Sequence, residues 1–174
     1  MSRTFFVEFA VSICISFGLP SFEETCAMEK ESADCQYWQS KVDAEVHTPT
    51  AAPIVDLSDQ QTVLDGIDCL LQMEGNRHSA KFDGATHLYV SQLFKPTTAE
   101  VAALYYISYL YYQKWDHADA VALRDENGEV NKPKAVRQAY QSYKKWFEQV
   151  KRLGLAKARE MKIEPLKDTK VHWY

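Results

Sequence analysis

The sequence predicts a mainly α-helical fold: a small helical bundle around a central aromatic-rich helix, with an irregular N-terminal arm. Residues 97–115 contain five tyrosines and one tryptophan but only two charged residues. Two other stretches, 59–74 and 133–153, repeat apolar residues at the spacing of an amphipathic helix. The chain is 46% apolar and 25% charged, which is ordinary for a globular protein. These observations favour one helical core.

The central helix is predicted to begin near residue 98. Thr97 and Glu100 have the three-residue separation of a capping box. A helix that is apolar on nearly every side has to be covered by its neighbours, so we expect this one at the centre of the bundle. Its buried stripe continues towards Leu123, with a break or bend near 114–116 as the alternative. The stripe consists of Val101, Leu104, Ser108, Tyr111, Trp115 and Ala118.

The preceding helix is predicted over residues 59–74. Ser58 and Gln61 form a second capping box before its apolar repeat. Gly75 and Asn76 are residue types that end helices, so we expect the helix to stop there.

The clearest helix follows a turn at 125–128 and begins at Pro133, a residue that suits the first helical position. Gly154 is expected to end it, and a short helix over 155–162 follows. The ending His172-Trp173-Tyr174 is too aromatic for a solvent-exposed tail. We therefore expect it to dock on the body of the protein.

The N-terminus predicts export. Residues 1–18 resemble a secretory signal peptide, residues 19–56 form an acidic irregular arm or linker, and residues 57–174 form the helical domain. The apolar run over residues 5–19 is too short for a stable membrane span. The expected location is periplasmic or secreted. Glu8 inside the apolar run argues against a signal peptide, and if residues 1–19 are not cleaved the protein is cytoplasmic.

The cysteines predict one disulfide bond. Cys69 falls on the polar face of the 59–74 helix, where a free thiol is out of place because free cysteine behaves as a small buried hydrophobe. Cys35 is its expected partner and Cys26 is the alternative. The other possibility is that Cys69 is a free thiol buried under the N-terminal segment. The cysteine spacing does not suggest zinc, and we expect no cofactor or metal.

Two acidic and histidine-containing clusters are the weak candidates for catalysis: Glu74 with His78, and Asp116 with His117. Glu74 lies on the apolar side at the end of its helix, so it is either paired with a cation such as Arg77 or kept for function with a raised pKa. A histidine beside carboxylates suits general base chemistry. The alternative for Asp116 and His117 is a solvated first turn of a helix.

Binding is the function we expect, because the sequence has no phosphate-binding loop and no hydrolase or metalloprotease motif. A chain with more tyrosine hydroxyls than its core can hydrogen-bond is typical of proteins with recognition surfaces. Residues 132–170 hold 12 basic and 4 acidic residues, which is too mixed for a nucleic-acid partner. The candidate surfaces are Tyr106, Tyr109 and Tyr112, and the basic face formed by Lys144, Lys145, Lys151 and Arg152.

The sequence thus predicts an exported, periplasmic-type helical binding protein, of the immunity or inhibitor type, whose partner is another protein. One alternative is a small hydrolase or metal-assisted enzyme that uses the Glu/His/Asp clusters. The other is a cytoplasmic helical adaptor whose first residues belong to the core.

Overall fold

The structure is a computed structural model that describes residues 35–49, 55–81, 97–115 and 117–174. Besides a short helical stretch at residues 35–39, its helices are α2 (Gln60–Leu71), α4 (Ala99–Tyr112), α5 (Pro133–Leu153) and α6 (Leu155–Glu160), and the strands β1 (Leu123–Arg124) and β2 (His172–Trp173) pair antiparallel. The predicted mainly helical fold is confirmed. The predicted signal peptide, Cys26 and Asp116 lie outside the described residues.

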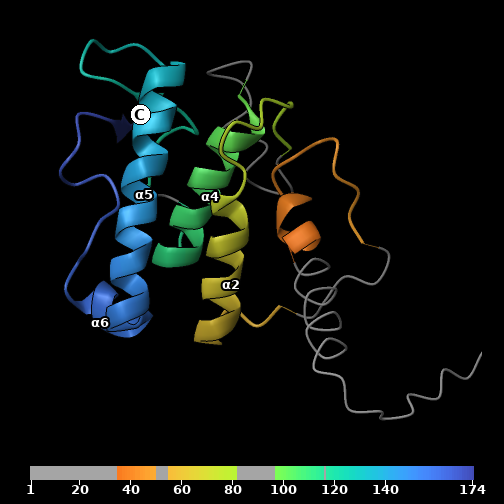
Figure 1. The fold of residues 1–174 in the computed structure, drawn as a ribbon, viewed down its shortest axis with the longest axis vertical. Helices are drawn as coiled ribbons and strands as arrows, with labels where there is room; N and C mark the ends of the chain where they lie inside the picture. Colours follow the sequence, from red (N-terminus) through yellow and green to blue (C-terminus); the bar gives the residue numbers. More distant parts are fainter. Residues whose placement is uncertain (1–34, 50–54, 82–96, 116) are drawn as a thin grey trace, which may run out of the picture.

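α4 is the central helix, as expected. It packs against α2 and α5, and α2 also contacts α5 (Figure 1). α2 and α4 run in opposite directions, whereas α4 and α5 run in the same direction (Figure 1). Beyond α6 the chain returns along α5 and reaches β1, so the aromatic C-terminus docks on the body as predicted.

Both ends of α4 differ from the prediction. Its N-cap is Thr98, whose side chain makes no capping bond, and the Glu100 carboxylate instead accepts the Gly75 N–H at 2.9 Å. The helix ends at Tyr112 because Gln113 takes a left-handed conformation with φ of 55°. Gln113 Nε2 then donates to the Leu57 carbonyl oxygen at 2.9 Å. The stripe therefore does not continue as helix towards Leu123.

The start of α2 is also capped by a different residue. The Asp59 side chain accepts the N–H groups of Gln61 and Thr62, while the Ser58 hydroxyl donates to Asp56. A carboxylate is a stronger acceptor for these amides than a hydroxyl. The capping box predicted at Ser58 is therefore wrong by one residue.

α5 follows its local signals closely. Pro133 occupies its first turn, and Gly154 ends it with φ of 81°. The predicted short helix follows as α6 and stops at Glu160. Where a helix carries its own start and stop residues, the sequence locates it well.

The described part of the N-terminal arm is tied to α2. Residues 35–39 are helical, and Cys35 forms the predicted disulfide with Cys69, with their Cα atoms 5.1 Å apart. Trp38 and Val42 are buried in the common core. This cover explains why Cys69, on the otherwise polar face of α2, is only 5% exposed.

Gly66 gives a test of this packing. A Cβ atom there would lie 2.7 Å from Cε2 of the buried Trp38 ring. Although alanine in a helix is normally more stable than glycine by roughly 1 kcal/mol, we expect Gly66→Ala to lower the free energy of unfolding by about 1–3 kcal/mol. Urea denaturation measures the change.

The control is the same substitution in a Trp38→Ala background. With the ring removed, Gly66→Ala should become neutral or stabilising. Equal destabilisation in both backgrounds would show that the arm does not pack on α2 as described.

Candidate binding site

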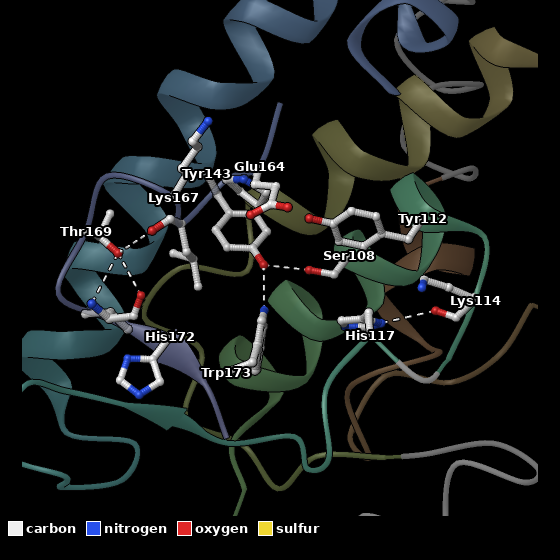
Figure 2. A pocket seen from close by; sticks show the side chains of 13 residues that line it. Ser108, Tyr112, Lys114, His117, Tyr143, Glu164, Lys167, Thr169, His172 and Trp173 are labelled. Atoms are coloured by element: carbon white, nitrogen blue, oxygen red, sulfur yellow. Dashed lines mark hydrogen bonds between the residues drawn. The ribbon is translucent and has the colours of Figure 1, made fainter. Parts of the chain in front are cut away.

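A cavity of about 600 Å³ lies between the end of α4, the middle of α5 and the C-terminal segment. α4 contributes Ser108 and Tyr112, and α5 contributes Tyr143. The C-terminal segment contributes residues 164–167, 169 and 171–173 (Figure 2). The wall is therefore built from three parts of the chain that are distant in sequence.

The floor of the cavity is a directed chain of hydrogen bonds. The Ser108 hydroxyl donates its proton to the Leu104 carbonyl oxygen, 3.1 Å away. The Ser108 oxygen therefore accepts from the Tyr143 hydroxyl at 2.6 Å, because a hydroxyl carries only one proton. Trp173 Nε1 donates to the Tyr143 oxygen at 3.0 Å. All three protons are committed, and because Ser108 is 1% and Tyr143 0% exposed, this network belongs to the core beneath the cavity.

Above this floor, the Tyr112 hydroxyl and the Glu164 carboxylate point towards one another (Figure 2). Burial raises the pKa of Tyr112 well above its ordinary value, and the negative charge of Glu164 raises it further. Tyr112 is therefore a neutral hydroxyl at physiological pH. Within the described parts of the chain, Glu164 forms no ion pair.

Two cationic side chains lie at the edge of the cavity. Lys114 and Lys167 line it and are exposed, and the ammonium group of Lys167 points away from the Tyr143 hydroxyl (Figure 2). His117 Nδ1 donates to the Lys114 carbonyl oxygen at 3.1 Å, and its ring packs 4.3 Å from that of Tyr105. The charged side chains of Lys114, Glu164 and Lys167 are thus exposed, whereas the Ser108 and Tyr143 hydroxyls are buried below them.

Two contacts hold the C-terminal segment at the end of α4. Arg159 of α6 donates to the carbonyl oxygens of Tyr111 and Leu110, at 2.7 and 3.1 Å. These carbonyls belong to the last turn of α4, where no helical N–H is available to them. At the other end of the segment, Leu123 of β1 pairs with Trp173 of β2, which fixes the indole at the floor.

A second feature is an aromatic platform, which we define as Tyr106, Tyr109 and Trp115. The Trp115 ring stacks on Tyr109 with centroids 3.5 Å apart and contacts Tyr106 edge-on at 5.4 Å. The Tyr105 hydroxyl donates to the Trp115 carbonyl oxygen, which holds the reversed chain in place. Tyr106 and Tyr109 are half-buried, and Trp115 is 38% exposed.

Trp115 is therefore not in the buried stripe where its spacing placed it. The left-handed Gln113 turns the chain back, so the indole lies over the opposite side of α4. The predicted stripe assumed a continuous helix, whereas the structure agrees better with the alternative, a break near 114–116, because α4 ends at Tyr112.

The predicted basic face is exposed on α5, but acidic neighbours neutralise part of it. Lys144 pairs with Glu74 at 2.6 Å, and Lys151 pairs with Glu148 at 2.7 Å. Lys145 and Arg152 are exposed. The partner suggested for Glu74 was Arg77, and the structure gives Lys144 instead. Lys144 lies 70 residues later in the chain, so no local pattern could identify it.

The candidate catalytic residues that the structure describes do not meet. Glu74 bonds to Lys144, His117 bonds to the Lys114 carbonyl, and His78 Nδ1 lies 3.0 Å from the buried Asp43 carboxylate. Among the described residues, no group of three or more His, Cys, Asp or Glu side chains is arranged to hold a metal ion. Residues from both expected clusters are therefore found in separate networks.

Comparison with known protein families, with curated proteins and with solved structures gives no match to this chain. The site is therefore argued from its own geometry. Of the cavity residues, the sequence singled out Tyr112 and His117 as candidates, and it gave them unrelated roles. The docking expected of the aromatic C-terminus was the signal for Trp173. Nothing in the sequence pointed to Glu164.

Asp43 gives a pH test of the network around His78. Its carboxylate is buried, which alone would raise its pKa, but hydrogen bonds from Glu45 N–H, Asn76 and His78 outweigh burial and lower it. A lowered pKa in the folded state means that this stabilisation is present above the pKa of the unfolded chain and is lost as pH falls through the folded value.

We expect Asp43→Asn to cost about 1–3 kcal/mol of unfolding free energy near neutral pH, because its new amide N–H₂ would face two donors. The gap between the two proteins should persist down to about pH 4 and shrink below it. Urea midpoints across this range measure it. A gap that stays constant into strong acid would contradict the assignment.

Proposed function

We propose that this chain is an exported helical binding protein that acts through protein–protein interaction, as immunity and inhibitor proteins do. The aromatic platform is the observation that carries the proposal. Tryptophan and tyrosine are the residues that most often anchor protein–protein interfaces, because each buries a large rigid surface with little loss of conformational entropy.

The platform suits this role because it is rigid before binding. Trp115 is held by stacking on Tyr109 and by the bond from the Tyr105 hydroxyl to its carbonyl oxygen. A partner would therefore not have to order the indole, and ordering costs weaken many interfaces. The helix below it is buried on its other sides, so a partner meets a firm surface.

The proposed location is the periplasm or the extracellular space. The Cys35–Cys69 bond supports this, because disulfides persist in oxidising compartments. Export would use residues 1–18 as a cleaved signal peptide. Within the described residues, none of the helices has the length and apolar character needed to span a membrane.

The partner proposal can be tested by capture from the native host with three proteins: the wild type, Trp115→Ala and Met161→Ala. Met161 is 53% exposed and lies outside the platform, so it controls for the loss of an exposed apolar side chain. We expect a discrete protein to be retained by the wild type and by Met161→Ala, and its affinity to fall roughly tenfold or more with Trp115→Ala.

Circular dichroism and the melting temperature verify that both variants are folded. Equal retention by Trp115→Ala would show that the platform is not the interface. Failure of the wild type to retain any protein would contradict the proposed function itself.

The location can be tested separately by mass spectrometry of the protein purified from its host. We expect a chain that begins at residue 19 and in which Cys35 and Cys69 are bonded to each other. Thiol labelling without reductant should leave both unmodified, and labelling after reduction should modify both. An uncleaved chain with all its thiols free would exclude export.

A further inference from the structure

We propose that Asn127 is a site of spontaneous chemical modification, at which the folded protein slowly converts asparagine into aspartate and isoaspartate. The reacting groups are the side-chain amide of Asn127, the backbone nitrogen of Gly128 and a water molecule. The site lies in the exposed turn between β1 and α5.

The side-chain amides of the three asparagines in the chain lie in different surroundings. Asn76 donates from Nδ2 to the buried Asp43 carboxylate at 2.7 Å, and Asn131 accepts the Leu123 N–H at 2.8 Å. Both are half-buried. Asn127 is exposed, and its side-chain amide makes no hydrogen bond within the described parts of the chain. Of the three, Asn127 has the amide carbon that is most open to attack.

The residue that follows Asn127 also favours the reaction. It is Gly128, whereas the other two asparagines precede an arginine and a lysine. A side chain on the following residue crowds the nitrogen that has to attack. At Gly128 no atom lies within 4 Å of the position that a Cβ would occupy. Glycine also has the widest choice of backbone angles, so the chain here can reach the geometry of ring closure.

The conversion needs only water as a co-reactant. The Gly128 nitrogen forms a bond to Cγ of Asn127, the Cγ–Nδ2 bond breaks, and ammonia leaves with the proton that the nitrogen gives up. Water then adds to one of the two carbonyl carbons of the cyclic imide, and the nitrogen regains a proton as its bond to that carbon breaks. Attack at Cγ gives aspartate. Attack at the backbone carbonyl gives isoaspartate, in which the main chain runs through the side chain.

Asp125 controls the rate because it holds the turn closed. Its carbonyl oxygen accepts the Gly128 N–H at 3.0 Å, and its carboxylate accepts the N–H groups of Asn127 and Glu129, each at 2.9 Å. The attacking nitrogen is therefore bonded in the closed turn, and attack requires local opening. Residues 126–129 are exposed, and exposed segments open more readily than the core. Modification is thus slow in the folded protein and faster where these bonds are lost.

The two products affect the fold differently. The turn connects Arg124 to Val130, which form an antiparallel bridge. Aspartate adds a negative charge and leaves the length of the main chain unchanged. Isoaspartate adds a carbon to the main chain between the two bridge residues, so the bridge and the turn cannot both keep their geometry. We therefore expect the isoaspartate form to melt at a lower temperature than the unmodified protein.

Peptide mapping by mass spectrometry tests the proposal on the folded full chain, sampled during incubation at mildly alkaline pH. We expect progressive conversion of Asn127 into two products of equal mass that chromatography separates. Asn76 and Asn131 should convert at least several-fold more slowly in the same samples. In urea, where the turn is lost, Asn127 should convert faster than in the folded protein.

Three variants test the residues. Asn127→Gln should abolish conversion at this position, because its longer side chain closes the ring far more slowly. Asp125→Ala should raise the rate at Asn127 several-fold, whereas Asp68→Ala, which removes an exposed carboxylate on α2, should leave it unchanged. Asn127→Asp carries the charge of the product without the added carbon, so it should melt as the wild type does, above the isoaspartate form.

Three results would each overturn the proposal. The first is an unmodified Asn127 in the folded protein after the chain in urea has been fully converted. The second is conversion of Asn76 or Asn131 as fast as that of Asn127. The third is an equal rate in Asp125→Ala and Asp68→Ala, which would show that the turn does not control the reaction.

Discussion

The burial of α4 is the constraint on which the rest of the structure depends. The helix is apolar on nearly every face, and its buried residues extend from Ala99 to Tyr111. One neighbour cannot cover such a helix, so α2, α5 and α6 each pack against part of it. The tyrosines in this core also need partners for their hydroxyls. Tyr140 finds one in the Glu100 carbonyl oxygen at 2.8 Å, and Tyr143 finds one in Ser108.

Both candidate binding surfaces arise where this coverage changes near the end of α4. Tyr109 and Tyr112 are three residues apart and so neighbours on the helix surface, but Tyr109 lies under Trp115 whereas Tyr112 lines the cavity. Between them in the sequence, the carbonyl oxygens of Leu110 and Tyr111 accept hydrogen bonds from Arg159. The same few residues thus separate the aromatic platform from the cavity.

The sequence predicted those features that depend on neighbouring residues or on one strong chemical preference. Pro133 and Gly154 mark the start and end of α5 because each acts through its own backbone. Cys69 indicated that another segment covers it, because a free thiol is out of place on a polar helix face. The features that it missed depend on contacts distant in sequence. Lys144 reaches Glu74 only after α2 and α5 have packed, and the left-handed turn at Gln113 is stabilised in part by Leu57. The helical periodicity of the sequence therefore placed Trp115 on the wrong side of α4.

The capping of α4 by Arg159 has a consequence for the chain during its synthesis. Arg159 follows Tyr111 by 48 residues, which at ordinary rates of translation takes roughly 2–10 s. During that interval the most aromatic segment of the protein has left the ribosome's active centre but lacks α5, α6 and the guanidinium that completes its last turn. Apolar surface that is exposed before folding is complete is prone to aggregate. The late contact that completes the bundle therefore leaves the unfinished chain exposed to aggregation.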